Sequence, residues 1–162
     1  MISKALKIKP NYICLVPENR KEVTTEGGLD LDKNKNKIKN IILKFKKKKI
    51  RTSLFINPSL QDIKLSKILG SKCIEIHTGK ISNQIKQKKN YSSELIKIKK
   101  CAIYAKNIGL EVHAGHGMDY KTTKILNKIK QIEEFNIGHF IIGESVSHSI
   151  SKVVKQFIKI LR

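Results

Sequence analysis

Two stretches rich in glycine and histidine are the most informative in the chain: Val112-His-Ala-Gly-His-Gly-Met118 and, further along, Asn136-Ile-Gly-His139. Each accompanies a short apolar run, at residues 110–114 for the first and 135–142 for the second. Glycines let the backbone approach a bound group closely, and imidazoles can transfer protons near neutral pH. Two such strand ends in succession indicate a site at one rim of a parallel sheet or barrel, where phosphate binding and catalysis are common. The pattern therefore predicts an enzyme of small phosphorylated metabolites.

The rest of the chain alternates between short apolar runs and helical patterns. We expect strands at residues 12–16, 52–56, 73–77, 110–114 and 136–142. We expect helices near 34–47, from Ser59 to before Gly70, over 91–108, near 122–129 and at about 145–161, the last with Val146, Ile150, Val153, Phe157 and Leu161 facing inward. Residues 2–6 also have helical spacing, which reads as the last turns of a helix that Pro10 ends. Strands that alternate with helices predict βαβ units and a parallel sheet.

Two α/β architectures fit this alternation. The units can form an open doubly wound sheet, or they can be the last five units of a (β/α)8 barrel. The glycine-rich ends of the final two strands favour the barrel, because phosphate sites there use the loops after strands seven and eight. Residues 1–162 then form a single, incomplete TIM-barrel domain with strands four to eight, the first three βα units being missing. Neither GxGxxG nor GxxxxGK[ST] occurs, so the sequence does not favour a nucleotide site.

The chain is strongly basic, with a formal net charge of +21. Only three of its 34 Lys and Arg residues are Arg, and it contains no Trp. Proteins that read nucleic acids use Arg for bidentate contacts and aromatic rings for stacking. We therefore expect no specific nucleic-acid partner, although weak, non-specific binding to polyanions follows from the charge alone.

The cysteines and the hydropathy pattern indicate the compartment. Cys14, Cys73 and Cys101 are odd in number and widely spaced, and no CxxC occurs. This usage predicts a reduced, cytoplasmic chain. Because no apolar run is long enough to span a membrane and no signal-peptide pattern follows Met1, we expect neither membrane insertion nor secretion.

Six motifs in chain order resemble those of one enzyme family. They are Cys14-Leu-Val-Pro-Glu18, Glu22-Val-Thr-Thr-Glu-Gly-Gly-Leu-Asp30, Ser53-Leu-Phe-Ile56, Ile74-Glu-Ile-His-Thr-Gly79, Ala114-Gly-His-Gly117 and Asn136-Ile-Gly-His139. Their order and spacing are similar to those of the pyridoxine 5′-phosphate synthase family, in its C-terminal two-thirds only. The resemblance implies a TIM barrel whose first three strands carry further substrate-binding residues, a catalytic His and a catalytic Glu, none of which aligns with this sequence.

The family reaction condenses 1-deoxy-D-xylulose 5-phosphate with 3-amino-2-oxopropyl phosphate to pyridoxine 5′-phosphate, phosphate and water. The resemblance implies no cofactor, because the substrates already carry the leaving phosphate and the carbonyl electrophiles. Small phosphorylated substrates and inorganic phosphate are the expected ligands, and a homo-oligomer is the expected assembly. We expect this chain alone to be impaired as an enzyme. The alternatives are a non-catalytic remnant of that enzyme and, on charge alone, a basic nucleic-acid-binding protein.

The resemblance also implies roles for particular residues. It gives catalytic roles to His116, as proton donor, and to Glu75, which helps to stabilise the transition state. It gives substrate-binding roles to Thr24, Gly117, Gly138 and His139. The residues by themselves leave a structural role open for each. His116 can be bonded to a neighbouring loop, and Gly117 and Gly138 can be needed by tight turns. Glu75 can be a carboxylate with its hydrogen bonds satisfied, and Thr24 an ordinary loop residue.

Several other polar residues are weighed in the same way. Alternation along the strand places Glu75 opposite its apolar neighbours and toward the barrel interior, with His77 on the same face. His113 and His116 are three apart and face opposite sides of a strand, and the sequence shows no Cys or carboxylate cluster to complete a site, so no metal is expected. Glu144 stands where relatives often carry Arg, and an acid there repels phosphate unless it points to solvent.

Overall fold

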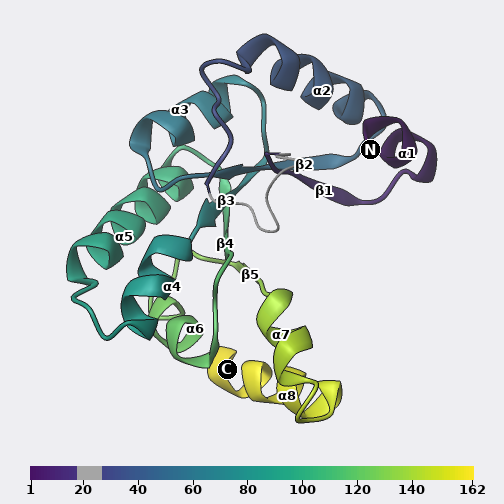
Figure 1. Ribbon diagram of the computed structural model, residues 1–162. Helices are drawn as coiled ribbons and strands as arrows, with labels where there is room; N and C mark the ends of the chain where they lie inside the picture. The colour runs from purple at the N-terminus through teal and green to yellow at the C-terminus, as the bar shows by residue number, and fades with distance from the viewer. Residues whose placement is uncertain (18–26) are drawn as a thin grey trace.

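The computed structural model describes residues 1–17 and 27–162. These residues contain the parallel strands β1 (Tyr12–Leu15), β2 (Arg51–Ile56), β3 (Cys73–His77), β4 (Glu111–Gly115) and β5 (Glu134–Asn136), which lie side by side in chain order. Every neighbouring pair is parallel. The sheet curls into a half-barrel with the helices on its outer side, as Figure 1 shows. The predicted α/β class and parallel sheet are confirmed.

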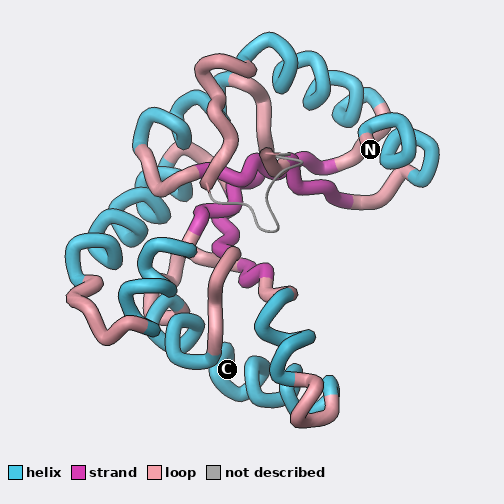
Figure 2. The backbone as a smooth tube through the Cα atoms, viewed as in Figure 1, coloured by secondary structure: helices cyan, strands magenta, loops and turns pink. Residues whose placement is uncertain are grey.

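The helices lie on an arc around the strands (Figure 2). They are α1 (Ile2–Ile8), α2 (Lys35–Lys47), α3 (Leu60–Ile68), α4 (Gly79–Lys86), α5 (Ser92–Asn107), α6 (Tyr120–Leu126), α7 (His139–Glu144) and α8 (Ile150–Leu161). Three of them begin at a polar cap: the Ser59, Asp119 and Ser149 side chains each accept a hydrogen bond from the main-chain N–H three residues later. Such caps satisfy N–H groups that a helix start leaves free.

The two faces of the sheet differ in chemistry because strand side chains alternate. The outward face carries apolar residues with no exposed surface, namely Leu54, Ile56, Ile74, Ile76, Val112 and Ala114, which belong to one core cluster with residues of the surrounding helices. The opposite, concave face carries polar side chains, among them Ser53, Glu75 and His113. The predicted inward orientation of Glu75 thus agrees with the register, which pairs it with Phe55 and His113.

The C-terminal part of the chain departs from the sequence-based expectation. The strand expected at 136–142 is wrong: β5 ends at Asn136, and helix α7 occupies most of the rest of that run. The closing helix begins at Ile150 rather than near 145, and Val146 and Ile150 are exposed, with 86% and 56% of their surfaces accessible. Leu161 is exposed too, whereas Val153 and Phe157 face inward as expected. Helix α4 was not anticipated.

Candidate functional site

A cavity of about 360 Å³ lies at the carboxyl ends of the strands. Its lining includes five of the residues singled out from the sequence, which come from three different strand ends: Glu75, His116, Gly117, Gly138 and His139. Thr24, the sixth, lies outside the described residues. The structure therefore brings together every predicted site residue that it describes.

Glu75 is the buried acid of this cavity. It is 8% exposed, and its Oε2 accepts a hydrogen bond from Asn136 Nδ2 at 2.8 Å, which links β3 to β5. Burial raises the pKa of the Glu75 carboxyl, although the bond from Asn136 and the nearby His113 act in the opposite direction. Gly115 on β4 makes room for this side chain, because a Cβ at that position would collide with Glu75 Oε1. Sequence reasoning missed both Asn136 and Gly115 as supports of Glu75.

His116 lies in a backbone conformation that histidine rarely adopts, with φ of 81°. Thr78, at the start of α4, holds this turn: its Oγ1 donates to the carbonyl oxygens of Gly115 at 2.8 Å and His116 at 2.7 Å. Gly117 follows with φ of 73°, which favours glycine. Strained residues that their surroundings hold in place are concentrated at functional sites.

The charge state of His116 is set by its surroundings. Burial is the largest cause that lowers the pKa of its imidazole, and the nearby Lys86 and His139 act in the same direction. The neutral ring is therefore favoured near pH 7, and a proton placed on it is more acidic than on a free imidazole. Lys86, at the end of α4, also lines the cavity. Its contribution could not be found from the sequence, which is rich in lysine throughout.

His77 packs against His116, with the two ring centroids 4.8 Å apart, and meets Phe55 edge-on at 5.3 Å. Burial and the neighbouring His116 lower the pKa of His77 to about 4. Its Nε2 has no hydrogen-bond partner within the described part of the chain. The expected placement of His77 on the face of Glu75 is therefore accompanied by direct contact with the candidate proton donor.

The two loop glycines differ in why they are glycine. Gly117 is required by its positive φ, and a Cβ there would lie 3.2 Å from Ser82 Cβ. Gly138, by contrast, has an ordinary φ of −112°, and nothing in the described structure lies within 4 Å of a Cβ built on it. A positive φ or a close neighbour therefore does not explain Gly138, which lines the cavity. Glu144 does not line that cavity, and its carboxylate faces His148 at 3.6 Å.

None of the helices within the described residues is both long and apolar enough to cross a membrane.

Comparison with known proteins identifies one family throughout. The family described as "Pyridoxal phosphate biosynthesis protein PdxJ" matches residues 1–162. Relatives named pyridoxine 5′-phosphate synthase include that of Pelagibacter ubique, 63% identical over 99% of this chain and 67% of the relative. That of Blochmanniella floridana is 41% identical over 100% of this chain and 65% of the relative. That of a Sulfurihydrogenibium species is 45% identical over 97% of this chain and 64% of the relative. The chain thus spans about two thirds of the length of the curated relatives that it matches.

Proposed function

The chain belongs to the PdxJ family of pyridoxal phosphate biosynthesis proteins, and from this premise we propose that it carries the C-terminal part of a pyridoxine 5′-phosphate synthase active site. The observation that carries the proposal is the cavity that gathers Glu75, His116, Gly117, Gly138 and His139 at one rim of the sheet. The substrates would be 1-deoxy-D-xylulose 5-phosphate and 3-amino-2-oxopropyl phosphate, which are the substrates of the family reaction.

We assign the five strands to positions four to eight of a (β/α)8 barrel. Their parallel chain-order arrangement and the outer ring of helices support this assignment. An apolar stripe on α8 supports it as well, because the next βα unit of a closed barrel would pack near it. The stripe consists of Ile150, Val154, Ile158 and Leu161, which are 37–56% exposed.

The chemistry proceeds through a Schiff base. The amine of one substrate attacks the ketone of the other, and proton transfers then drive elimination of phosphate and ring closure. His116 would supply a proton, since its lowered pKa makes the imidazolium a stronger acid. Glu75, held by Asn136, would stabilise the charge that develops at the reacting carbon atoms.

The phosphate end of the site would be formed by Gly117, Gly138 and His139, with the positive charge of Lys86 nearby. Inorganic phosphate alone should then bind weakly, with a Kd near 1 mM, equivalent to about −4 kcal/mol. A Cβ at Gly138 meets no atom within 4 Å in the described structure, so Gly138→Val should keep the fold and lose phosphate. Equal phosphate binding by both proteins in calorimetry would remove this loop from the site.

The test of the function is product formation from the two substrates. We would compare the chain alone, the chain with a polypeptide that carries the first three βα units of a relative, and that mixture with His116→Ala. Because single acid–base groups contribute about 10²–10⁴-fold, the mixture should be active, and His116→Ala should reduce its rate by that factor. His148→Ala, an exposed histidine outside the cavity, is the matched control.

Each result of this comparison has a defined meaning. Full activity of the unaided chain would contradict the expectation that this chain is impaired without the first three βα units. Complementation that ignores His116→Ala would contradict the proton-donor role. An inactive mixture that still forms a stable complex would favour the non-catalytic remnant.

Location and assembly are also proposed. We place the protein in the cytoplasm, because phosphorylated substrates of this kind are charged and do not cross membranes unaided. We propose a homo-oligomer, which light scattering of the purified protein would test directly through its mass in solution.

A further inference from the structure

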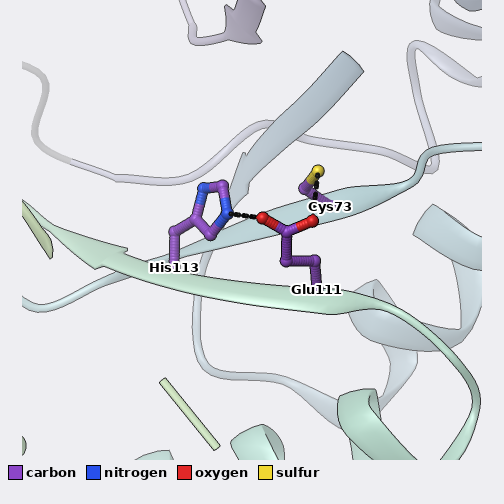
Figure 3. A group of neighbouring side chains, drawn as sticks. All are labelled: Cys73, Glu111 and His113. Atoms are coloured by element: carbon purple, nitrogen blue, oxygen red, sulfur yellow. Dashed lines mark hydrogen bonds and ion pairs between the residues drawn. The ribbon is translucent and has the colours of Figure 1, made fainter. Parts of the chain in front are cut away.

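A second cluster of chemically active side chains lies on the concave face, away from the cavity. It consists of Cys73 on β3 and of Glu111 and His113 on β4, drawn in Figure 3. Cys73 and Glu111 are direct cross-strand partners, and His113 follows two residues later on the same face. The sequence alone shows no Cys or carboxylate cluster to complete a site with the histidines, because the register that brings Cys73 next to Glu111 cannot be read from the sequence.

The three side chains can offer one ligand atom each to a single ion. Their sulfur, oxygen and nitrogen atoms all lie within 4.8 Å of one another. His113 Nε2 is 3.0 Å from Glu111 Oε1, and Cys73 Sγ is 3.9 Å from Glu111 Oε2. Because bonds from zinc to sulfur, nitrogen and oxygen are about 2.0–2.3 Å long, ligand atoms at these separations need only small side-chain adjustments to share one ion.

The surroundings of His113 favour Nε2 as a ligand. The ring is completely buried, and its other nitrogen, Nδ1, lies 3.0 Å from Tyr12 Oη and 3.6 Å from Glu134 Oε1. Metal-binding histidines are commonly held in this way, with the second ring nitrogen bonded to a polar neighbour that fixes the ring. Nε2 is then left to face Glu111 and the space between the two strands.

We propose that Cys73, Glu111 and His113 form a Zn²⁺ site in the wall of the half-barrel. A mixed set of thiolate, imidazole and carboxylate ligands suits zinc, whereas calcium and magnesium prefer oxygen ligands alone. Binding would release the thiol proton of Cys73 to solvent, and water would complete the fourth position. The ion would join β3 to β4 at a layer nearer the start of the strands than Glu75, and no step of the proposed reaction requires it.

The side of the site that faces the opposite end of the sheet is the Glu111 side. A cavity of about 620 Å³ lies there, and Glu111 forms part of its lining. Arg51, also in that lining, competes for the same carboxylate, because its Nη1 lies 2.6 Å from Glu111 Oε2. The Arg51 side chain is 41% exposed, so it can turn toward solvent when an ion binds. The site therefore predicts that Arg51 weakens zinc binding.

The test uses Co²⁺ as a spectroscopic probe and Zn²⁺ in competition with a chromophoric chelator. The wild-type chain should bind one ion and show the absorption of a cobalt–thiolate bond. Cys73→Ser should lose that absorption and weaken Zn²⁺ binding by about 100-fold or more, since even indirect supports of a ligand change affinity by about 10–100-fold. Cys101→Ser is the matched control, because Cys101 is a buried free thiol on α5, outside the cluster.

Two results would overturn the proposal: no stoichiometric binding to the wild-type chain, or a cobalt–thiolate absorption that survives in Cys73→Ser. Arg51→Gln provides a test that does not disturb the core. It should tighten Zn²⁺ binding about fivefold, the effect of removing a partly exposed ion pair. Unchanged or weaker binding by Arg51→Gln would remove Glu111 from the site. Neither measurement depends on catalysis, so both remain valid if the proposed synthase activity fails.

Discussion

At the residue scale, His116 is held by its neighbours in a conformation that it would otherwise avoid. A positive φ at a residue other than glycine costs roughly 1–3 kcal/mol, and it persists only where the surrounding structure requires it. Here Thr78 fixes the carbonyl groups on either side, and glycines flank the histidine. The imidazole is thereby aimed at the cavity rather than allowed to rotate with a mobile loop.

Burial of His77 makes the stability of the fold depend on pH. The pKa of His77 falls from 6.5 to about 4 on folding, so the folded state binds fewer protons than the unfolded state between these values. The stabilisation that the folded state gains by keeping His77 neutral is complete above pH 6.5 and is lost as the pH falls toward 4. Between about pH 7 and 5, urea denaturation should therefore show a smaller loss of unfolding free energy for His77→Gln than for the wild-type chain.

His148→Gln serves as the control for this measurement, because His148 is 45% exposed and lies outside the site. It should behave as the wild-type chain does. If His77→Gln kept the full decrease between the two pH values, the pH dependence would have another source.

Gly115 should be intolerant of a side chain for a steric reason. A Cβ there meets Glu75 Oε1 and lies 3.1 Å from the main-chain oxygen of Asn136. Gly115→Ala should therefore lower the free energy of unfolding by about 1–3 kcal/mol, as overpacking of a core does. Gly138→Ala, which meets no atom within 4 Å, should change it by less than about 0.5 kcal/mol.

A double-mutant cycle with Glu75→Ala locates the cause of the Gly115→Ala effect. Removal of the carboxylate should reduce the penalty of the added methyl group. An equal penalty in both backgrounds would show that the collision with Glu75 is not responsible.

At the element scale, the loops after β3 and β4 are joined through one hydroxyl group. Thr78 Oγ1 contacts the carbonyl oxygens of Gly115, the last residue of β4, and of His116, and its main-chain N–H donates to Gly115 O at 2.9 Å. Thr78→Val keeps the shape and removes the hydroxyl, so it should cost about 1–3 kcal/mol of unfolding free energy. Thr78→Ser, which retains the donor, should cost clearly less in the same thermal or urea measurement. A larger loss in Thr78→Ser than in Thr78→Val would mean that the methyl group, rather than the hydroxyl, holds the loops.

The limits of prediction from sequence are clearest at this scale. Strands β1 to β4 follow from short apolar runs, and α5 follows from the buried spacing of Ile98, Ala102 and Ala105. The run at 135–142 is mostly apolar, and such a short run cannot distinguish a buried strand from a short helix. The pairing of Cys73 with Glu111 could not be predicted from the sequence either, because the register depends on how two strands are shifted relative to each other.

At the scale of the whole molecule, the curled sheet separates two kinds of chemistry. Its outer face is an apolar core shared with the helices, while its concave face carries most of the polar side chains of the strands, such as Ser53, Glu75 and His113. The proposed catalytic residues lie at the carboxyl ends of the strands, and the proposed zinc ligands Cys73 and Glu111 lie toward the opposite ends. Fold and activity both therefore depend on what covers the concave face.

Closure of the barrel can be tested at the two edges of the sheet. β1 and β5 are the outer strands, whereas β3 already has a neighbour on each side. Unpaired N–H and C=O groups at an edge readily accept another strand. In the presence of a polypeptide that carries three further βα units, hydrogen exchange should slow in residues 12–15 and 134–136. Exchange in residues 73–77 should stay as it was, which makes β3 the internal control.

The apolar stripe on α8 gives an independent test of the same closure. Ile158, 42% exposed, lies on the stripe, and Lys159 is its neighbour in the last turn. Ile158→Glu should weaken binding of the complementing polypeptide because it buries a charge in the new contact, whereas Lys159→Glu should leave binding much less affected. A complex that forms equally well with both variants, and in which exchange at β1 and β5 is unchanged, would show that added units do not close the sheet. The five strands would then have to work as the open half-barrel in which they are seen.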